Sequence, residues 1–294
     1  MPKLVSIMSE LVKRTLSGAA YVAVIIGSIL YDNGWIWGLI SVFLAYFAVR
    51  EFNRLTHPKC LIDNYSQLSG AILVYLFASH FLIHGDFTYS SFAICVLFIV
   101  CIMLCVLLEL WDKNGNPLAN WGNFALGQMI VALPFALMNI LCGMDKYLLL
   151  AVFVLIWVND SFAYLVGVST AKLPKGNHKM FPRVSPKKSW EGLFGGIVFS
   201  LIAGALLAHY GWFSAVQTPM NTYLLGMLFA LFVSVFGTFG DLVESLIKRT
   251  VGVKDSGRFL PGHGGILDRF DSMLLATPMS LALIFIIEQC SKAL

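Results

Sequence analysis

Charge is scarce in this chain of 294 residues, because Asp, Glu, Lys and Arg together make up only 12% of it. Average soluble domains contain about 25% charged residues and about 45–50% apolar ones. Here the hydrophobic share is 58% and the mean hydropathy is +0.79. These values exclude an ordinary soluble domain and predict an all-α, polytopic integral membrane protein.

Other features are also missing from the sequence. Its six cysteines form no CxxC pair, so we expect neither a thiol-based metal site nor a disulfide framework. The first apolar run lacks a small-x-small cleavage pattern, so no secretory signal is expected. The basic residues follow the loops and form no continuous patch, which gives no support to nucleic-acid binding.

Long apolar runs are present instead. A helix needs about 20 residues to cross a bilayer. We identify nine such runs, at residues 15–31, 33–51, 67–84, 88–110, 121–142, 146–168, 190–210, 222–246 and 272–290. The sequence therefore predicts about nine transmembrane helices in a single membrane-embedded domain, 1–294. Within it, 1–145 is mainly scaffold, 146–271 is the catalytic half and 272–294 is the last span.

The basic residues predict the orientation in the membrane. With nine spans, all but two of the 20 Lys and Arg fall on one side, the exceptions being Lys146 and Lys292. The positive-inside rule then places the N-terminus and the loops near 169–189 and 247–271 in the cytoplasm. Because no organelle-targeting segment is evident, we expect a bacterial inner membrane with the active site facing the cytoplasm.

A carboxylate, Asp160, lies within the apolar run 146–168. A carboxylate in hydrocarbon costs about 2.5–3.5 kcal/mol, so it must face protein, water or a cation. Helical spacing lets Asp160 share a face with Asn159 and Tyr164. The alternative is a hydrogen-bonded aspartate that only locks helix packing.

The loop 172–192, KLPKGNHKMFPRVSPKKSWEG, is strongly basic. Ser185, followed by a proline, predicts the start of a helix. Lys187 and Lys188 would then lie beside the free N–H groups of its first turn, which is an arrangement suited to phosphate. Glu191 could orient a lysine or bind a ligand. For the other lysines, a solvated cytoplasmic loop is the simpler interpretation.

The segment 240–249, GDLVESLIKR, places Asp241, Glu244 and Lys248 at i, i+3 and i+7. These positions form one stripe on an otherwise apolar helix, so the stripe must face something polar. Alternatively, Glu244 and Lys248 form a simple i, i+4 ion pair. That alternative leaves Asp241 unexplained.

The most polar stretch, KDSGRFLPGHGGILDRFDS at 254–272, interrupts two apolar runs. Its glycines allow close backbone approach to a ligand, and such turns can point N–H groups at a phosphate. Asp268 and Asp271 follow at i, i+3. A surface turn also uses glycines, but it would not need these two aspartates directly after it.

All four stretches lie at or near the predicted cytoplasmic face. Mg²⁺ is usually held by one or two carboxylates together with substrate phosphates, and Lys and Arg suit a polyphosphate. The inventory therefore favours metal-assisted phosphoryl or nucleotidyl transfer at a membrane surface. A transporter or channel is the main alternative, but its acids would be spread through the membrane depth.

Residues 245–271, SLIKRTVGVKDSGRFLPGHGGILDRFD, resemble the signature of the phosphatidate cytidylyltransferase (CDP-diacylglycerol synthase) family. The pattern is Ser-x-apolar-Lys-Arg, four residues, Lys-Asp, and later His-Gly-Gly-apolar-x-Asp-Arg-apolar-Asp. Every fixed position is present. The segments NDSFAY and SPKKSWEG resemble other family segments in the same order.

The resemblance implies that CTP and phosphatidic acid give CDP-diacylglycerol and pyrophosphate, by in-line attack of the lipid phosphate on the α-phosphorus. It also implies a paired-cation site with Mg²⁺, with K⁺ as a candidate second cation, and a homodimer. A CTP-dependent lipid-alcohol kinase would use similar cations but transfer the γ-phosphate, and only the 245–271 signature separates the two. The Asp-Gly-x-x-Ala-Arg pattern of CDP-alcohol phosphotransferases is absent.

Residues and resemblance together assign candidate roles. The candidate cation ligands are Asp241, Asp268, Asp271 and Asp160. The candidates for holding CTP phosphates or pyrophosphate are Lys187, Lys188, Lys248, Arg249 and Arg269, with Ser185 and Glu191 helping to seat the nucleotide. His263, Gly264 and Gly265 would shape the loop over the phosphates, and acid–base action by His263 is the alternative.

Overall fold

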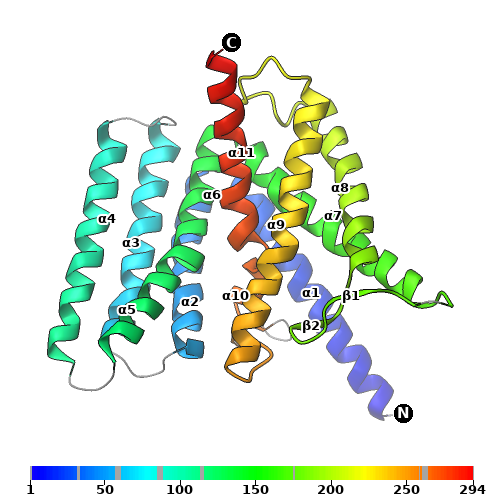
Figure 1. The fold of residues 1–294 in the computed structure, drawn as a ribbon, viewed down its shortest axis with the longest axis horizontal. Coiled ribbons are helices and arrows are strands. Elements are labelled where there is room, and N and C mark those ends of the chain that lie inside the picture. The colour runs from blue at the N-terminus through cyan, green and yellow to red at the C-terminus, as the bar shows by residue number, and fades with distance from the viewer. Residues whose placement is uncertain are drawn as a thin grey trace. The chain divides into compact units, whose positions relative to one another are not determined.

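A computed structural model describes residues 2–31, 34–56, 61–84, 89–112, 116–174, 176–257, 259 and 264–293 (Figure 1). These residues are mainly helical, and they include one antiparallel sheet of two short strands. The chain forms two compact units. Unit 1 comprises 1–143 and 251–270, and unit 2 comprises 144–250 and 271–294. Most of the glycine-rich loop therefore belongs to the same unit as the N-terminal helices. The description as a single domain stays a prediction.

Unit 1 is built from helices that pack side by side. Helix α2 packs against α1 and α3, and α3 packs against α4, as Figure 1 shows for the last pair. A continuous helix, α5–η2–α6, contains a π-helical turn at η2, and π-turns often occur at functional sites. The elements are α1 (Pro2–Leu30), α2 (Trp35–Thr56), α3 (Leu61–His84), α4 (Tyr89–Leu108), η1 (Glu109–Trp111), α5 (Pro117–Leu126), η2 (Gly127–Ala132), α6 (Leu133–Met144) and α10 (Leu267–Phe270).

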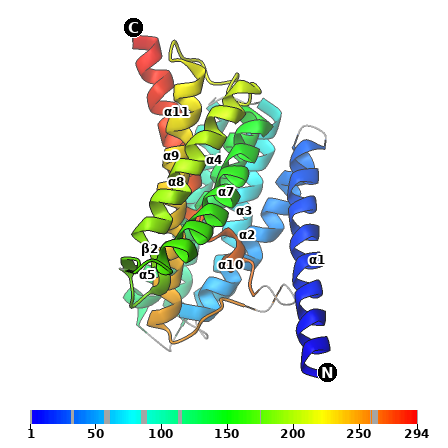
Figure 2. The same ribbon diagram turned by 90° about the vertical axis from the view of Figure 1, so that its right-hand side faces the viewer.

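Unit 2 holds four long helices and the small sheet. Helix α7 packs against α8, α8 against α9 and α9 against α11, and Figure 2 shows these helices in succession. Asp145 caps α7, since its side chain accepts a hydrogen bond from the Tyr147 N–H at 2.8 Å. The elements are α7 (Lys146–Ala171), β1 (Lys179–Phe181), β2 (Ser185–Ser189), α8 (Trp190–His209), α9 (Thr222–Thr250) and α11 (Met273–Ala293).

In the described part of the chain, six helical segments are long and apolar enough to cross a membrane. They are Trp35–Thr56, Pro117–Met144, Lys146–Ala171, Trp190–His209, Thr222–Thr250 and Leu267–Ala293, with shorter apolar helices at Ser17–Leu30 and Val96–Trp111. The all-α, polytopic membrane fold is therefore supported. The count of nine spans and the cytoplasmic N-terminus stay predictions. Four cysteines are described as free thiols, namely Cys101, Cys105, Cys142 and Cys290.

Candidate active site

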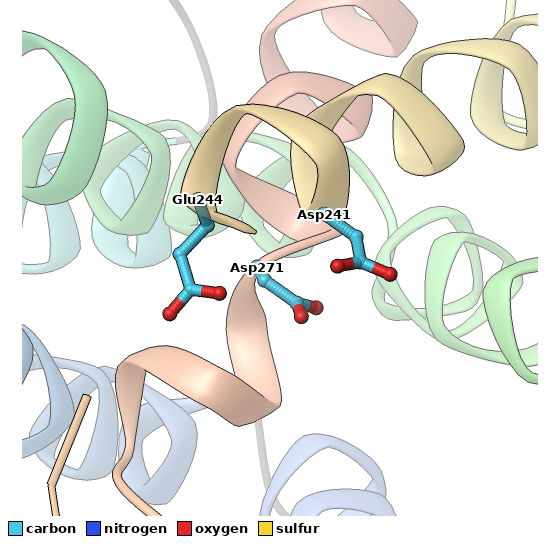
Figure 3. Close-up of side chains that lie close together, drawn as sticks. All are labelled: Asp241, Glu244 and Asp271. Atoms are coloured by element: carbon cyan, nitrogen blue, oxygen red, sulfur yellow. The ribbon is translucent and has the colours of Figure 1, made fainter. Parts of the chain in front are cut away.

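Three carboxylates gather in unit 2 (Figure 3). Asp241 and Glu244 project from α9, and Asp271 projects from the turn between α10 and α11. One ligand oxygen from each residue lies within 4.8 Å of the others. Glu244 is buried, whereas Asp241 and Asp271 are half-buried. We call these three residues the carboxylate cluster.

Local structure explains why the cluster forms. The i, i+3 spacing places Asp241 and Glu244 on one face of α9. The preceding residue, Gly240, faces the backbone of the turn, and a Cβ atom there would lie only 2.7 Å from the Asp271 carbonyl oxygen. Glycine therefore permits the close approach that brings Asp271 to α9. Asp268 and Asp271 were predicted at i, i+3, but α10 ends at Phe270 and α11 begins at Met273, so no continuous helix joins them.

Two lysines neutralise part of the cluster. The Nζ atom of Lys188 lies 2.7 Å from Asp241 Oδ2 and donates a hydrogen bond to the Thr238 carbonyl oxygen at 3.1 Å. Lys248 forms an ion pair with Glu244, which confirms the i, i+4 interpretation of that pair. Three carboxylates thus face two ammonium groups, and the excess negative charge suits a cation. Carboxylate oxygens at this spacing fit a hard ion such as Mg²⁺.

Two neighbouring residues of α7, Asn159 and Asp160, lie close to the carboxylate cluster but differ in exposure. Asn159 is buried and donates a hydrogen bond to Thr238 Oγ1 at 3.2 Å. Asp160 is exposed and interacts electrostatically with Lys188 and Asp241. Tyr164 is 70% exposed. A side-chain hydrogen bond also joins Asn159 to Asp160, so these two residues interact as expected, while the place of Tyr164 on the same face stays a prediction.

The prediction that Ser185 begins a helix is wrong. Ser185 lies in β2, where it pairs with Phe181 of β1, and the helix begins five residues later at Trp190. Ser189 is the true cap, because its Oγ accepts a hydrogen bond from the Gly192 N–H at 3.2 Å. The pairing of β1 with β2 outweighed the local helix-start preference of Ser-Pro. The free N–H groups of α8 therefore do not lie at Ser185.

The lysines that follow Ser185 point in different directions. In a strand, successive side chains alternate between faces. Lys187 is exposed, whereas Lys188 is half-buried and reaches Asp241. The Nε atom of Arg249, at the end of α9, donates to the Val184 carbonyl oxygen at 3.4 Å, which connects α9 to the hairpin.

Glu191 was expected to orient a lysine or bind a ligand, but it contacts His178 next to the hairpin. Its Oε1 atom lies 2.6 Å from His178 Nδ1, and both carboxylate oxygens accept the His178 backbone N–H at 3.0 Å. The residue before β1 is thereby tied to the first turn of α8. Glu191 thus supports the strand that carries Lys188.

Residues 251–270 of the signature lie in unit 1, where Asp268 organises the glycine-rich loop. The Asp268 carboxylate accepts hydrogen bonds from the backbone N–H of Ser256, at 2.9 and 3.1 Å, and of Gly265, at 2.8 Å. Gly264 has a φ of 87°, a conformation that favours glycine. Arg269 is exposed. His263 lies outside the described residues.

The carboxylate cluster joins some of the predicted site residues and adds one. It includes Asp241 and Asp271, and Lys188 and Lys248 contact it. Glu244 was seen in the sequence as an ion-pair partner but not as a candidate cation ligand. Its place in the acidic stripe of α9 was the signal that pointed to it.

Comparisons with known proteins show the family of the chain. A model described as the cytidylyltransferase family matches residues 12–287. The chain belongs to the phosphatidate cytidylyltransferase family. As a family member it is a nucleotidyltransferase, an enzyme of phospholipid biosynthesis embedded in a membrane.

Three relatives illustrate the similarity, one over most of the chain and two over about half of it. A phosphatidate cytidylyltransferase of Bacillus subtilis (strain 168) is 32% identical over 277 residues, which cover 92% of this chain and 96% of that relative. One of Staphylococcus epidermidis is 46% identical over 134 residues, covering 46% of this chain and 47% of the relative. One of Staphylococcus aureus (strain COL) is 47% identical, also over 134 residues.

Proposed function

We propose that this enzyme transfers CMP from CTP to phosphatidic acid, giving CDP-diacylglycerol and pyrophosphate. An oxygen of the lipid phosphate attacks the α-phosphorus of CTP, the bond from that phosphorus to the bridging oxygen breaks, and pyrophosphate leaves with the bonding electrons. The carboxylate cluster beside Lys188 and Lys248 carries the proposal, because it combines cation ligands with phosphate-binding groups.

The carboxylate cluster, with Asp268 and Asp160 as further candidates, would hold Mg²⁺. When bound, this cation neutralises charge on the phosphate oxygens during transfer. K⁺ is the proposed second cation. The carboxylate oxygens of the cluster support Mg²⁺, whereas the assignments of K⁺, Asp268 and Asp160 rest on the sequence and the family resemblance.

The basic residues would bind phosphate groups. Lys188 and Lys248 already lie against carboxylates and can turn toward CTP phosphates when a cation takes their place. Arg249, Arg269 and Lys187 would bind the pyrophosphate portion, and Gly264 and Gly265 would shape the loop over it. Little covalent chemistry is required of the protein, since phosphoryl transfer depends mainly on positioning and charge.

The proposed location is a bacterial inner membrane, with the site on the cytoplasmic face. The distribution of Lys and Arg supports this orientation. A homodimer is proposed on the family resemblance. Labelling of reconstituted protein by a reagent that cannot cross the membrane would test the orientation at single introduced cysteines.

The reaction is tested with purified protein in detergent, phosphatidic acid, Mg²⁺ and CTP labelled with ³²P at either the α or the γ position. The expected result is label in the lipid fraction from α-labelled CTP alone. Lipid label from γ-labelled CTP would instead identify a kinase. Absence of lipid label with folded protein would rule out the transferase.

A further inference from the structure

A stripe of α2 in unit 1 contacts the signature segment. Phe43, Phe47 and Glu51 occupy i, i+4 and i+8, so they share one face of the helix. The ring of Phe259 lies 5.0 Å from that of Phe47 and 6.0 Å from that of Phe43, measured between centroids. The aromatic part of the stripe thus holds Phe259 of the loop.

Glu51, one turn further along α2, binds both ends of the same loop. Its Oε2 atom accepts a hydrogen bond from the backbone N–H of Leu267 at 2.9 Å and from the Ser256 hydroxyl at 3.1 Å. Glu51 is only 7% exposed. A buried carboxylate requires strong donors, and these contacts provide them.

The loop backbone is shaped around this carboxylate. A Cβ atom at Gly257 would lie 2.4 Å from Glu51 Oε1, and one at Gly265 would lie 2.3 Å from Glu51 Oε2. Both positions therefore need glycine in order to approach Glu51. Two signature glycines thus have a packing reason that involves a residue outside the signature.

Glu51 and Asp268 act on the same residue from two directions. Asp268 accepts the backbone N–H of Ser256, while Glu51 accepts its hydroxyl. Asp268 also accepts the N–H of Gly265, and Glu51 accepts that of Leu267. Together the two carboxylates join the beginning of the loop, at Ser256, to its end, at 265–267.

We propose that Glu51 is a positioning residue for the transfer reaction. From the N-terminal half, it sets the positions of 256–257 and 265–267, the two ends of the phosphate-binding loop. The proposal rests on the proposed function of that loop. It assigns a role in the reaction to a helix that the sequence indicated only as scaffold. In this role Glu51 acts on the loop, through Ser256 and Leu267, and not directly on the substrates.

The test compares Glu51→Met, which has similar length but no oxygen acceptor, with Glu51→Gln, which keeps one acceptor oxygen. Ser256→Ala removes only the hydroxyl partner. Ser41→Ala is the matched control, because Ser41 is a buried polar residue of the same helix whose side chain bonds to Asn139 of α6. Wild-type transfer of label from α-labelled CTP is measured first and tests the proposed function separately.

The first readout does not depend on the reaction. Hydrogen–deuterium exchange is followed at residues 256–267 in protein without substrate. In Glu51→Met, exchange of the Leu267 amide should accelerate about tenfold or more, because its acceptor is lost and local opening becomes easier. Glu51→Gln should show a smaller change, and Ser41→Ala should match wild type in this segment.

The second readout is the kinetics. The KM for CTP should rise about tenfold in Glu51→Met and less in Glu51→Gln, because misplacement of a binding group by a fraction of an ångström weakens its contacts. A purely structural defect would lower the amount of active enzyme without changing KM. An unchanged KM and unchanged exchange in the Glu51 variants, with wild type active, would overturn the proposal. If Glu51→Met does not fold, Ser256→Ala takes its place. A KM for CTP and a loop exchange rate in Ser256→Ala that both equal those of the wild type would then overturn the proposal.

Discussion

Two pairs of acidic side chains, one pair in each unit, differ in their partners. In unit 2, Asp241 and Glu244 pair with lysine ammonium groups. In unit 1, Asp268 and Glu51 accept hydrogen bonds from the backbone of one loop. A flexible lysine can turn aside when a cation binds, whereas a backbone amide is released only if the loop changes shape. The carboxylates of unit 2 are therefore suited to exchange a lysine partner for a cation, and those of unit 1 are suited to hold the loop in one conformation.

The largest loss of activity is expected from changes to the carboxylates of unit 2, whose lysine partners can be replaced by a cation. Asp241→Asn and Asp271→Asn should each reduce kcat/KM about 100- to 1000-fold, the scale for removing one preorganised electrostatic contact at a reacting centre. The concentration of Mg²⁺ required for half-maximal activity should also rise. Label transfer from α-labelled CTP, measured over a Mg²⁺ titration, checks both effects.

Glu288→Gln is the control for these variants. Glu288 lies on α11 near the C-terminus, and its carboxylate accepts the Gln217 N–H at 3.4 Å. This variant should keep wild-type kinetics. If it loses as much activity as the cluster variants, the effect is a general response to lost charge in unit 2 and the cluster has no special role.

A smaller loss of activity is expected when the close approach of Asp271 to α9 is disturbed at Gly240. Gly240→Ala introduces a Cβ atom 2.7 Å from the Asp271 carbonyl oxygen, so the turn must move away from α9. A shift of about 1 Å in a catalytic group can cost about 100-fold in rate, and we expect a loss of about ten- to 100-fold in kcat. Steady-state kinetics and Mg²⁺ titration measure it.

Gly237→Ala is the matched control on the same helix. A Cβ atom at Gly237 would meet its nearest neighbour, Ile156 Cγ1, at 3.6 Å, which is an ordinary contact. Alanine also favours helix by about 1 kcal/mol relative to glycine. Gly237→Ala should therefore keep its activity, and equal losses in the two variants would show that close approach at Gly240 is not the cause.

The smallest of the three effects is expected at Asp268, and it tests whether this carboxylate binds a cation or only holds the loop. Asp268→Asn keeps an acceptor oxygen for the loop but removes the charge. We expect exchange of the Ser256 and Gly265 amides to accelerate, because charged acceptors bind amides about twice as strongly as neutral ones. The Mg²⁺ requirement should rise about threefold, which is less than in Asp241→Asn. Faster exchange without any change in the Mg²⁺ requirement would show that Asp268 holds the loop and binds no cation.

Much of the site could be predicted from sequence spacing, but not the paths of its segments. The stripe of Asp241, Glu244 and Lys248 and its ion pair follow from the periodicity of one helix, and the structure has them. Ser185 misled because a Ser-Pro signal describes local preference, and hairpin pairing outweighed it. Asp271 came to α9 through a break between two helices that the spacing of Asp268 and Asp271 did not indicate.

By itself, the sequence determined the membrane character, the family and the inventory of carboxylates, lysines and glycines at the site. These are properties of composition and of short segments, since hydropathy and helical periodicity act over a few turns. Only the tertiary structure decided which carboxylates meet. Asp241 contacts Lys188 of the hairpin, and Glu51 binds Ser256 and Leu267, across more than 200 positions in the latter case. Such partners are chosen by helix packing and strand pairing, which no local pattern encodes.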